Sequence, residues 1–592
     1  MNNLKKKDLN INILYLWRPS RFFWALAISS FIVWLLLGPI WWRHVDDFGP
    51  IQFFIKRDCS FWDSYQLLDG FGSYPPIWSL WTAISYFFKI IGLTETRYIL
   101  LIQGFITAII SAYLTICVSL KIISNSTKKN SNIKIEKYIP FIVILAIAFN
   151  LFNPEIMLHS ITYMPYNLST ITTLSLLLLI LSSQNNFQFS PGGFPLHQIK
   201  FSFSNLLFLA YVSLFFSFQS IILLIGILIT KIYCRDINNT NFLNLGILNI
   251  NLNKIFKFSS FNCFSKINLL IDFLKLFLLY LPISYIYKFL ILLKRSTRPG
   301  SWANGLDNVY DLTFGNYQFF EWILKCFKNT SSIIGQAIYP FRIFQDEAAI
   351  LLSIFIVFSL IFIDKFKNSG KVFLINMSFV FIISILLATF GNFIYSPTRH
   401  TIFLYPYIWI LLILIFFGIH IQLSKLFENF GPNCLVYLSL IIFFTSIIGL
   451  VNSHNQIQYT KEDRYKLVNM AKDSDYFIDD IYLLEGVSLF SSHGSIEMES
   501  VHNKKCTLKK INGQNKIKFF SYNHRYPLNI KTNKNHLQEL IKRSNGCISS
   551  KDKVKIINKF EKKNKLDIEQ NNRIYNGGSN IYAYVIEVSK EN

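Results

Sequence analysis

The sequence lacks any closely spaced pair of cysteines. Its eight cysteines are scattered over 592 residues, with no CxxC pair and no zinc-ligand spacing. This pattern excludes the common zinc-binding and CxxC redox motifs. Cys506 and Cys547 both lie in the C-terminal tail, where a disulfide can form if the tail faces an oxidising compartment. Two free thiols fit the sequence equally well, because sequence gives no distance between them.

Charged residues are also scarce, at 16% of the chain, and acidic residues are fewest, with 34 Asp and Glu against 58 Lys and Arg. Hydrophobic residues make up 52% and aromatic residues 17%. A soluble protein of this size could not cover so much apolar surface. The net charge of +24 therefore indicates lysines and arginines that anchor a membrane protein on its cytoplasmic side, and no nucleic-acid partner is expected.

The N-terminus carries no small-residue cleavage site after its first apolar segment, so that segment reads as an uncleaved helix. Segments long enough to cross a bilayer recur along the chain and predict an all-α polytopic membrane protein with about eleven transmembrane helices. The stretch 203–233 is split into two helices near residues 217–220. The predicted segments are 22–42, 97–120, 138–152, 166–183, 203–233, 267–292, 348–364, 372–391, 401–423 and 434–452.

The apolar segment 74–92 is the ambiguous one. If it lies along the membrane surface rather than crossing it, the lysines near 121–137, 231–266 and 365–371 all fall inside the cell, as the positive-inside bias favours. We therefore expect surface-lying helices in the first outside loop. The N-terminus is then cytoplasmic, and the loops 43–96, 153–165, 293–347 and 392–400 lie outside, in a bacterial inner membrane.

The last part of the chain is hydrophilic and long enough to form its own domain. We predict a transmembrane domain over 1–452 and a soluble extracytoplasmic domain over 453–592. The tail mixes helical and strand patterns, which indicates a small α/β domain. Residues 580–588 are rich in β-branched and aromatic side chains and predict a terminal strand.

Two adjacent carboxylates, Asp46 and Asp47, follow the first apolar segment at its outer end. Acidic side chains beside a bilayer are costly unless they bind a ligand or take part in chemistry. One of them could accept a proton from a hydroxyl if burial or its neighbour raised its pKa. An exposed acidic turn, or a cap for a helix near Gly49, is the simpler alternative.

Two further elements share the predicted outer side. The first is Tyr74-Pro75-Pro76, and the second is Arg399-His400, at the mouth of a predicted helix. An arginine and a histidine there could hold a lipid phosphate through charge-assisted hydrogen bonds. Interfacial snorkelling is the alternative for both side chains.

With these motifs in this order, the chain resembles the GT-C superfamily of polytopic glycosyltransferases, and most closely its protein mannosyltransferase and aminoarabinose-transferase branch. The resemblance covers residues 20–420 by topology and rests on a few short motifs. In that branch an acidic pair in the first outside loop is followed by surface helices and a Pro-Pro element, and an arginine-histidine motif comes late. The second acid is Asp47 where many relatives have Glu, which leaves open which carboxylate is the base.

The resemblance implies an inverting transfer of a sugar from a polyprenyl-phosphate donor to a lipid, glycan or protein acceptor. Asp46, with Asp47, would be the base. The donor phosphate would be bound by Arg399 and His400, with Arg298 and Lys294 as further candidates. No cofactor is required, because phosphate leaves as a stabilised anion, although a divalent metal ion is compatible with the reaction.

Glu155, His159 and Tyr74 are expected on the same side and could support the acceptor. For Glu155 and His159 a structural role is the more common case, because one Glu and one His do not make a metal site.

Two other classes of protein remain open. A polysaccharide polymerase or O-antigen ligase would concentrate functional arginines in a large outside loop and would leave the acidic pair without a role. A non-enzymatic lipid-glycan transporter would show charges at mid-membrane depth and inverted repeats. The sequence shows few such charges and no repeat.

Overall fold

The computed structural model describes the helices and strands together with the short connections between some of them. Its described residues are 19–37, 96–127, 135–160, 166–182, 212–213, 217, 219–237, 312, 318–338, 368–390, 393–396, 399–426, 431–457, 461–478, 499–500, 516–523, 528, 537–538, 540–541, 544, 547–562 and 581–589.

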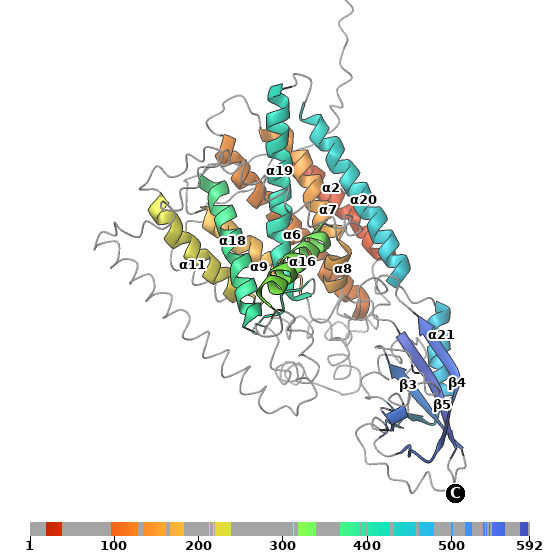
Figure 1. Cartoon of the computed structure of the whole chain (residues 1–592). Helices are drawn as coiled ribbons and strands as arrows, with labels where there is room; N and C mark the ends of the chain where they lie inside the picture. Colours follow the sequence, from red (N-terminus) through yellow and green to blue (C-terminus); the bar gives the residue numbers. More distant parts are fainter. Residues whose placement is uncertain are drawn as a thin grey trace, which may run out of the picture.

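Long apolar helices form a bundle (Figure 1), as the hydrophobic segments predict. Four of the described helices are long and apolar enough to cross a bilayer, within 101–124, 369–389, 400–424 and 433–451. The predicted break near 217–220 is confirmed, because α11 begins at Ser220. The predicted segments 74–92, 267–292 and 348–364 lie outside the described residues. The bundle helices are α2 (Pro19–Leu37), α6 (Thr96–Thr127), α7 (Ile139–Leu151), α9 (Leu168–Ser182), α11 (Ser220–Ile237), α18 (Asn368–Thr389), α19 (Tyr405–Leu426) and α20 (Asn433–Ile457).

Helix α6 lies at the centre of the bundle and packs on α7, on α9 and on the short helix α8 (Pro154–Ser160). One side of α6 carries small residues at helical spacing that are buried, namely Gly104, Ala108, Ser111, Ala112 and Thr115. The opposite side exposes isoleucines at positions 102, 106 and 110. Small residues let helix backbones approach closely, which is the usual basis of helix packing in lipid. The distribution therefore indicates a helix packed against protein on one side and exposed to lipid on the other.

Interhelical hydrogen bonds join small polar side chains inside the bundle. The Ser111 and Thr170 hydroxyls are 3.0 Å apart. The Tyr407 hydroxyl donates to Asn376 Oδ1 at 2.6 Å, and Asn376 Nδ2 donates to Thr230 Oγ1 at 3.2 Å. These contacts connect α6 with α9, and α11 with α18 and α19, because a polar group in an apolar medium is stabilised by a partner on a neighbouring helix.

Two predicted loops contain helices. Residues 153–165 include the short helix α8 (Pro154–Ser160), and residues 293–347 include α16 (Phe319–Ala337). The sequence analysis did not predict these helices, because neither segment is apolar along its whole length. α8 has 7 residues, about two turns of helix, and is capped by Asn153, whereas α16 is apolar on only part of its circumference.

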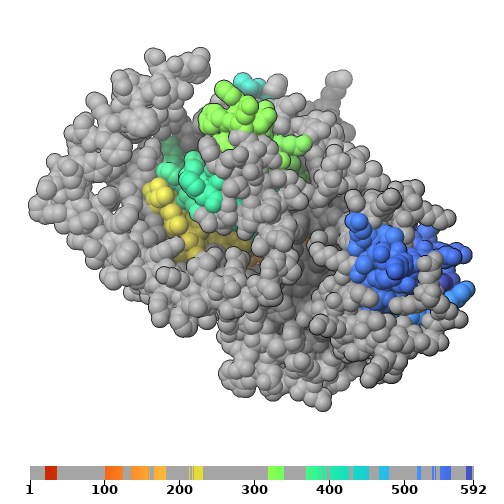
Figure 2. All heavy atoms as spheres, turned by 60° about the horizontal axis from the view of Figure 1, so that its bottom comes forward, coloured from red at the N-terminus to blue at the C-terminus, as the bar shows by residue number. Residues whose placement is uncertain are grey.

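The described part of the tail is a helix, α21 (Lys461–Lys472), with a five-stranded sheet of order β2-β1-β3-β5-β4. Strands β2, β1 and β3 run parallel, whereas β5 is antiparallel to both β3 and β4. The predicted terminal strand is confirmed as β5, the central antiparallel strand. Figure 2 shows the tail at one side of the molecule, away from α11, α16 and α18. The strand bounds are β1 (Tyr476–Phe477), β2 (Glu499–Ser500), β3 (Lys516–Asn523), β4 (Lys553–Lys562) and β5 (Ile581–Ser589).

The tail has a hydrophobic core of its own. Four side chains of β5 pack with side chains of β3 and with buried residues between β3 and β4. The members from β5 are Tyr582, Tyr584, Ile586 and Val588, those from β3 are Ile517 and Phe519, and those between the strands include Leu528 and Leu540. Cys547 belongs to this core and is disulfide-bonded. Cys506, the residue with which the sequence suggests pairing, lies outside the described residues.

Candidate functional site

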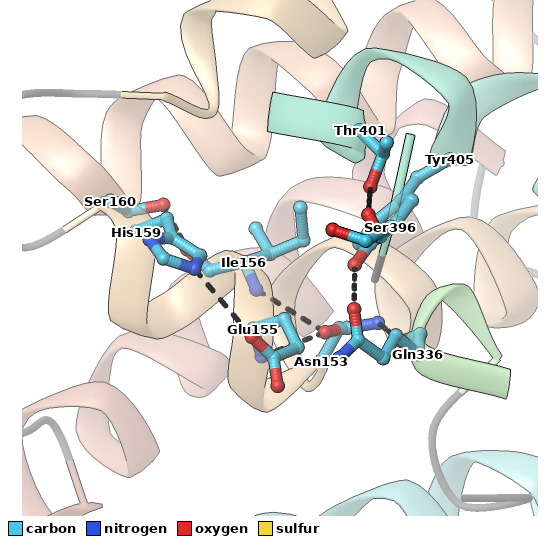
Figure 3. A network of polar contacts seen from close by, with 9 residues as sticks. All are labelled: Asn153, Glu155, Ile156, His159, Ser160, Gln336, Ser396, Thr401 and Tyr405. Carbon is cyan, nitrogen blue, oxygen red and sulfur yellow. Dashed lines mark hydrogen bonds and ion pairs between the residues drawn. The ribbon is translucent and has the colours of Figure 1, made fainter. Parts of the chain in front are cut away.

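Asn153 connects the ends of two helices at the centre of a buried polar cluster (Figure 3). Its side-chain Oδ1 accepts hydrogen bonds from the backbone N–H groups of Glu155 and Ile156, at 2.9 and 3.2 Å, and so caps the N-terminus of α8. Its Nδ2 donates to the carbonyl oxygens of Gln336 and Ala337, at 3.0 and 3.1 Å, at the C-terminus of α16. One amide therefore satisfies free backbone groups of both helix ends.

The start of α19 completes this junction. The Tyr405 hydroxyl donates to Gln336 Oε1 at 3.0 Å, and Trp409 Nε1 donates to the Ala337 carbonyl at 2.7 Å. All of these side chains are buried. The cluster thus joins three segments that are distant in the sequence. Asn153 and Gln336 are 183 residues apart, and Gln336 and Tyr405 are 69 residues apart.

Glu155 and His159 face each other on α8. Glu155 Oε2 and His159 Nε2 are 3.6 Å apart, one helical turn from each other, and both side chains are buried. Burial of a carboxylate is costly without a compensating partner, and the imidazole supplies one. The acid lies in the first turn of the helix, where the helix dipole favours a negative charge, and the histidine lies in the last turn.

Aromatic contacts extend this pair toward the arginine-histidine segment. The His159 ring lies edge-to-face on Tyr166, with centroids 5.7 Å apart, and Tyr166 lies edge-to-face on His400, with centroids 6.0 Å apart. The structure therefore brings three predicted site residues, Glu155, His159 and His400, to one place. Tyr166, which joins them, was not predicted, and a tyrosine between two apolar segments carries no sequence signal of such a role.

Residues 393–396 and 399–404 receive hydrogen bonds from several helices. Asn329 Nδ2 donates to the Tyr395 carbonyl at 2.7 Å, and the Tyr395 and Thr330 hydroxyls are 2.8 Å apart. Thr401 Oγ1 donates to the Ser396 carbonyl at 2.9 Å (Figure 3), and Thr173 Oγ1 donates to the Phe403 carbonyl at 2.9 Å. Burial raises the pKa of Tyr395 well above its ordinary value, so its hydroxyl stays protonated and able to donate.

Arg399 and His400 begin the 3-10 turn η6 (Arg399–Leu404), which leads directly into α19. Of the other predicted site residues, Asp46, Asp47, Tyr74, Lys294 and Arg298 lie outside the described residues. The helix that precedes the acidic pair is described, and Trp34 Nε1 near its end donates to the Leu151 carbonyl at 2.7 Å. The C-terminal end of α2 therefore lies beside the end of α7, two residues before Asn153.

Glu155 was predicted in a loop and is instead a buried helical residue, as is His159. The sequence Asn153-Pro154 carried the missed signal, because Asn is a favoured N-cap and Pro a favoured first helical residue.

The donor set at this site suits hydrogen bonding and proton transfer better than metal binding. Among the described residues, no group of three or more His, Cys, Asp and Glu is placed to share a metal ion. Glu155 and His159 would supply two ligands, fewer than a metal site ordinarily uses. A buried carboxylate beside an imidazole can instead orient a hydroxyl or accept its proton.

Comparisons with known proteins give no relative: no protein-family profile, curated protein or solved structure matches the chain.

Proposed function

We propose that the protein is an integral-membrane glycosyltransferase that moves a sugar from a polyprenyl-phosphate donor to an acceptor outside the cytoplasm. The observation that carries the proposal is the meeting of α8, the C-terminus of α16 and the segment 393–405 in one buried polar cluster. This cluster contains Glu155, His159 and His400, and the end of α2 lies beside it. The chain reaches Asp46 nine residues after α2 ends at Leu37.

In the proposed reaction, Asp46 or Asp47 accepts the proton of an acceptor hydroxyl. The acceptor oxygen attacks the anomeric carbon, the bond to the lipid phosphate breaks, and the anomeric configuration inverts. Arg399 and His400, with Lys294 and Arg298, stabilise the departing phosphate. Glu155 and His159 orient the acceptor or the groups around it, because α8 holds their side chains one helical turn apart and facing each other.

The disulfide of Cys547 supports an extracytoplasmic tail, since such bonds persist in oxidising compartments. α20 leads into the tail from the same end of the bundle at which α8 and α16 lie (Figure 1). We therefore infer that the polar cluster also faces outward. A bacterial inner membrane, with the N-terminus inside, is the setting that we propose.

The test is sugar release from a radiolabelled polyprenyl-phosphate sugar pool, in membranes that carry the protein or a variant. We expect Asp46→Asn or Asp47→Asn to lower turnover by about 10²- to 10⁴-fold, as loss of a general base does. Arg399→Ala should lower turnover through weaker phosphate binding. Asp473→Asn is the matched control, because this exposed aspartate follows α21 in the tail and should leave turnover unchanged.

Full turnover in both aspartate variants would sink the proposed mechanism. Absence of turnover with every donor pool would instead favour a lipid-glycan transporter. Glu155→Gln tests the role of the Glu155–His159 pair, because the substitution keeps the size of the side chain and removes the negative charge that faces His159. If this variant changes only the dependence of turnover on acceptor concentration, Glu155 and His159 act on the acceptor.

A further inference from the structure

Helix α16 presents three different sides along its length. Its buried side packs on the bundle through Cys326, Asn329 and Ile333. A second side is apolar and exposed, and Phe320 and Leu324 retain 78% and 69% of their accessible surface. The apolar exposed residues, at positions that fall on one stripe of a helix, are Phe319, Phe320, Ile323, Leu324 and Phe327.

The third side carries the charges of the helix. Glu321 and Lys328 are exposed, and Lys325 is half-buried. At 100° per residue these three positions form a strip beside the apolar stripe, and the buried side lies on the other edge of that strip. A helix in water would place charges wherever it is exposed. α16 instead divides its exposed surface into one apolar strip and one charged strip.

The two exposed strips match the two sides of a membrane–water interface. An interfacial helix buries phenylalanine and leucine among the acyl chains and keeps lysines at the headgroups. The exposed apolar surface of α16 resembles that of the bundle helices, where Ile382 and Leu386 of α18 and Ile441 of α20 are also exposed. Figure 1 shows α16 running obliquely across α19, and Figure 2 shows atoms of α16 at the molecular surface in that view.

From these features we propose that α16 lies in the membrane–water interface, with its phenylalanine side inserted into the outer leaflet and its lysine side among the headgroups. The bilayer is the occupant to which the geometry points, because the apolar stripe adjoins Lys325 and Lys328 and matches the exposed apolar surface of the bundle helices. The C-terminus of α16 is bonded to Asn153, Tyr405 and Trp409. Insertion of α16 therefore fixes the polar cluster at headgroup depth.

The experiment replaces single residues of the full-length protein with the photoreactive p-benzoylphenylalanine in native membranes, followed by irradiation and mass spectrometry of the adducts. Phe320 and Leu324 report on the apolar strip, and Lys328 reports on the charged strip of the same helix. Ile441 in α20 is the lipid-facing reference. We expect phospholipid adducts at positions 320, 324 and 441, with a yield at least about tenfold higher at 320 than at 328, since the charged side stays in water.

Lipid adducts at 441 but none at 320 would overturn the proposal. Equal lipid adducts at 320 and 328 would also overturn it, because α16 would then be submerged rather than interfacial. Crosslinks from position 320 to a second copy of the chain or to another protein would also overturn the proposal, because the apolar strip would then contact protein rather than lipid. None of these readings depends on sugar transfer, so they stay distinct from the outcome of the turnover assay.

Discussion

The helix bundle and the tail place polar and apolar side chains in opposite ways. In α20, Ile441 and Phe444 are about 60% exposed, while Ser439 and Ser446 are buried. In the tail, β4 turns Lys553 and Lys555 outward and keeps Val554 and Ile556 half-buried. The tail follows the rule for proteins in water, and the bundle follows the rule for proteins in lipid, where apolar surface costs nothing and polar groups need partners.

A lysine on the exposed side of each region gives the largest contrast. Ile441→Lys lies near the middle of the apolar part of α20 and should cost about 3 kcal/mol of insertion free energy. Ile557→Lys lies on the exposed side of β4, where Ile557 is already 40% exposed, and should change stability by less than about 0.5 kcal/mol. The measurement is the inserted fraction and abundance of each variant. Equal losses in both variants would remove the contrast.

The close approach of the α6 and α8 backbones is a second feature of the bundle that can be tested. A Cβ at Gly104 of α6 would come within 2.7 Å of the Ser160 carbonyl oxygen, so α8 would have to move away from α6. We expect Gly104→Ala to cost about 1–3 kcal/mol, the usual range for overpacking. Thermal unfolding in detergent and hydrogen exchange of α8 would measure this.

Gly335→Ala in α16 is the matched control, because a Cβ there meets no atom within 4 Å. It should be neutral or slightly stabilising, since Ala favours helix over Gly. A loss as large as that of Gly104→Ala would show that the cost arises from the substitution itself and not from contact with Ser160.

The tail also buries a tyrosine hydroxyl, that of Tyr584, which has a hydrogen-bond partner on each side. Tyr584 accepts from the Leu528 N–H at 2.9 Å and donates to Glu561 Oε1 at 3.2 Å. Tyr584→Phe should lower the stability of the tail by about 1–2 kcal/mol, because it leaves a buried donor unpaired. Hydrogen exchange of the β5 amides in the full-length protein would measure the loss.

The same tyrosine gives the tail a dependence on alkaline pH. Burial, ahead of its other causes, raises the pKa of Tyr584 above the ordinary value of 10. As the pH rises through that value, the unfolded chain loses its phenolic proton first, so stability is full below about pH 10 and falls above it. The fall should be smaller in Tyr584→Phe. An identical alkaline profile in both proteins would exclude Tyr584 as the cause.

The smallest expected effect is the coupling between Tyr407 and Asn376 inside the bundle. A double-mutant cycle with Tyr407→Phe and Asn376→Ala should give about 0.6 kcal/mol, and not above about 1.7 kcal/mol, as for other hydrogen bonds between membrane helices. The value is modest because the unfolded chain in a membrane also finds partners. A coupling near zero would mean that the 2.6 Å contact adds no stability.

Much of the fold could be predicted from local pattern. The segments predicted over 138–152, 372–391 and 434–452 correspond to α7, α18 and α20, and the strand predicted over 580–588 is β5. The length of an apolar run and its content of β-branched and aromatic residues depend on the neighbouring residues alone, so sequence is sufficient for them. α16 was missed because its apolar residues cover only one strip of the helix, within a segment that also contains charges.

The sequence by itself determined that this is a membrane protein with a hydrophilic tail, and it marked Glu155, His159 and His400 as candidates. Only the tertiary structure decided that these three lie together, that Tyr166 joins them and that Asn153 caps two helices at once. The hydrogen-bond partners of Asn153, Gln336 and Ala337, are more than 180 residues away in the sequence. Such contacts follow from how the helices pack, and packing depends on the shapes of distant side chains, which local sequence patterns do not specify.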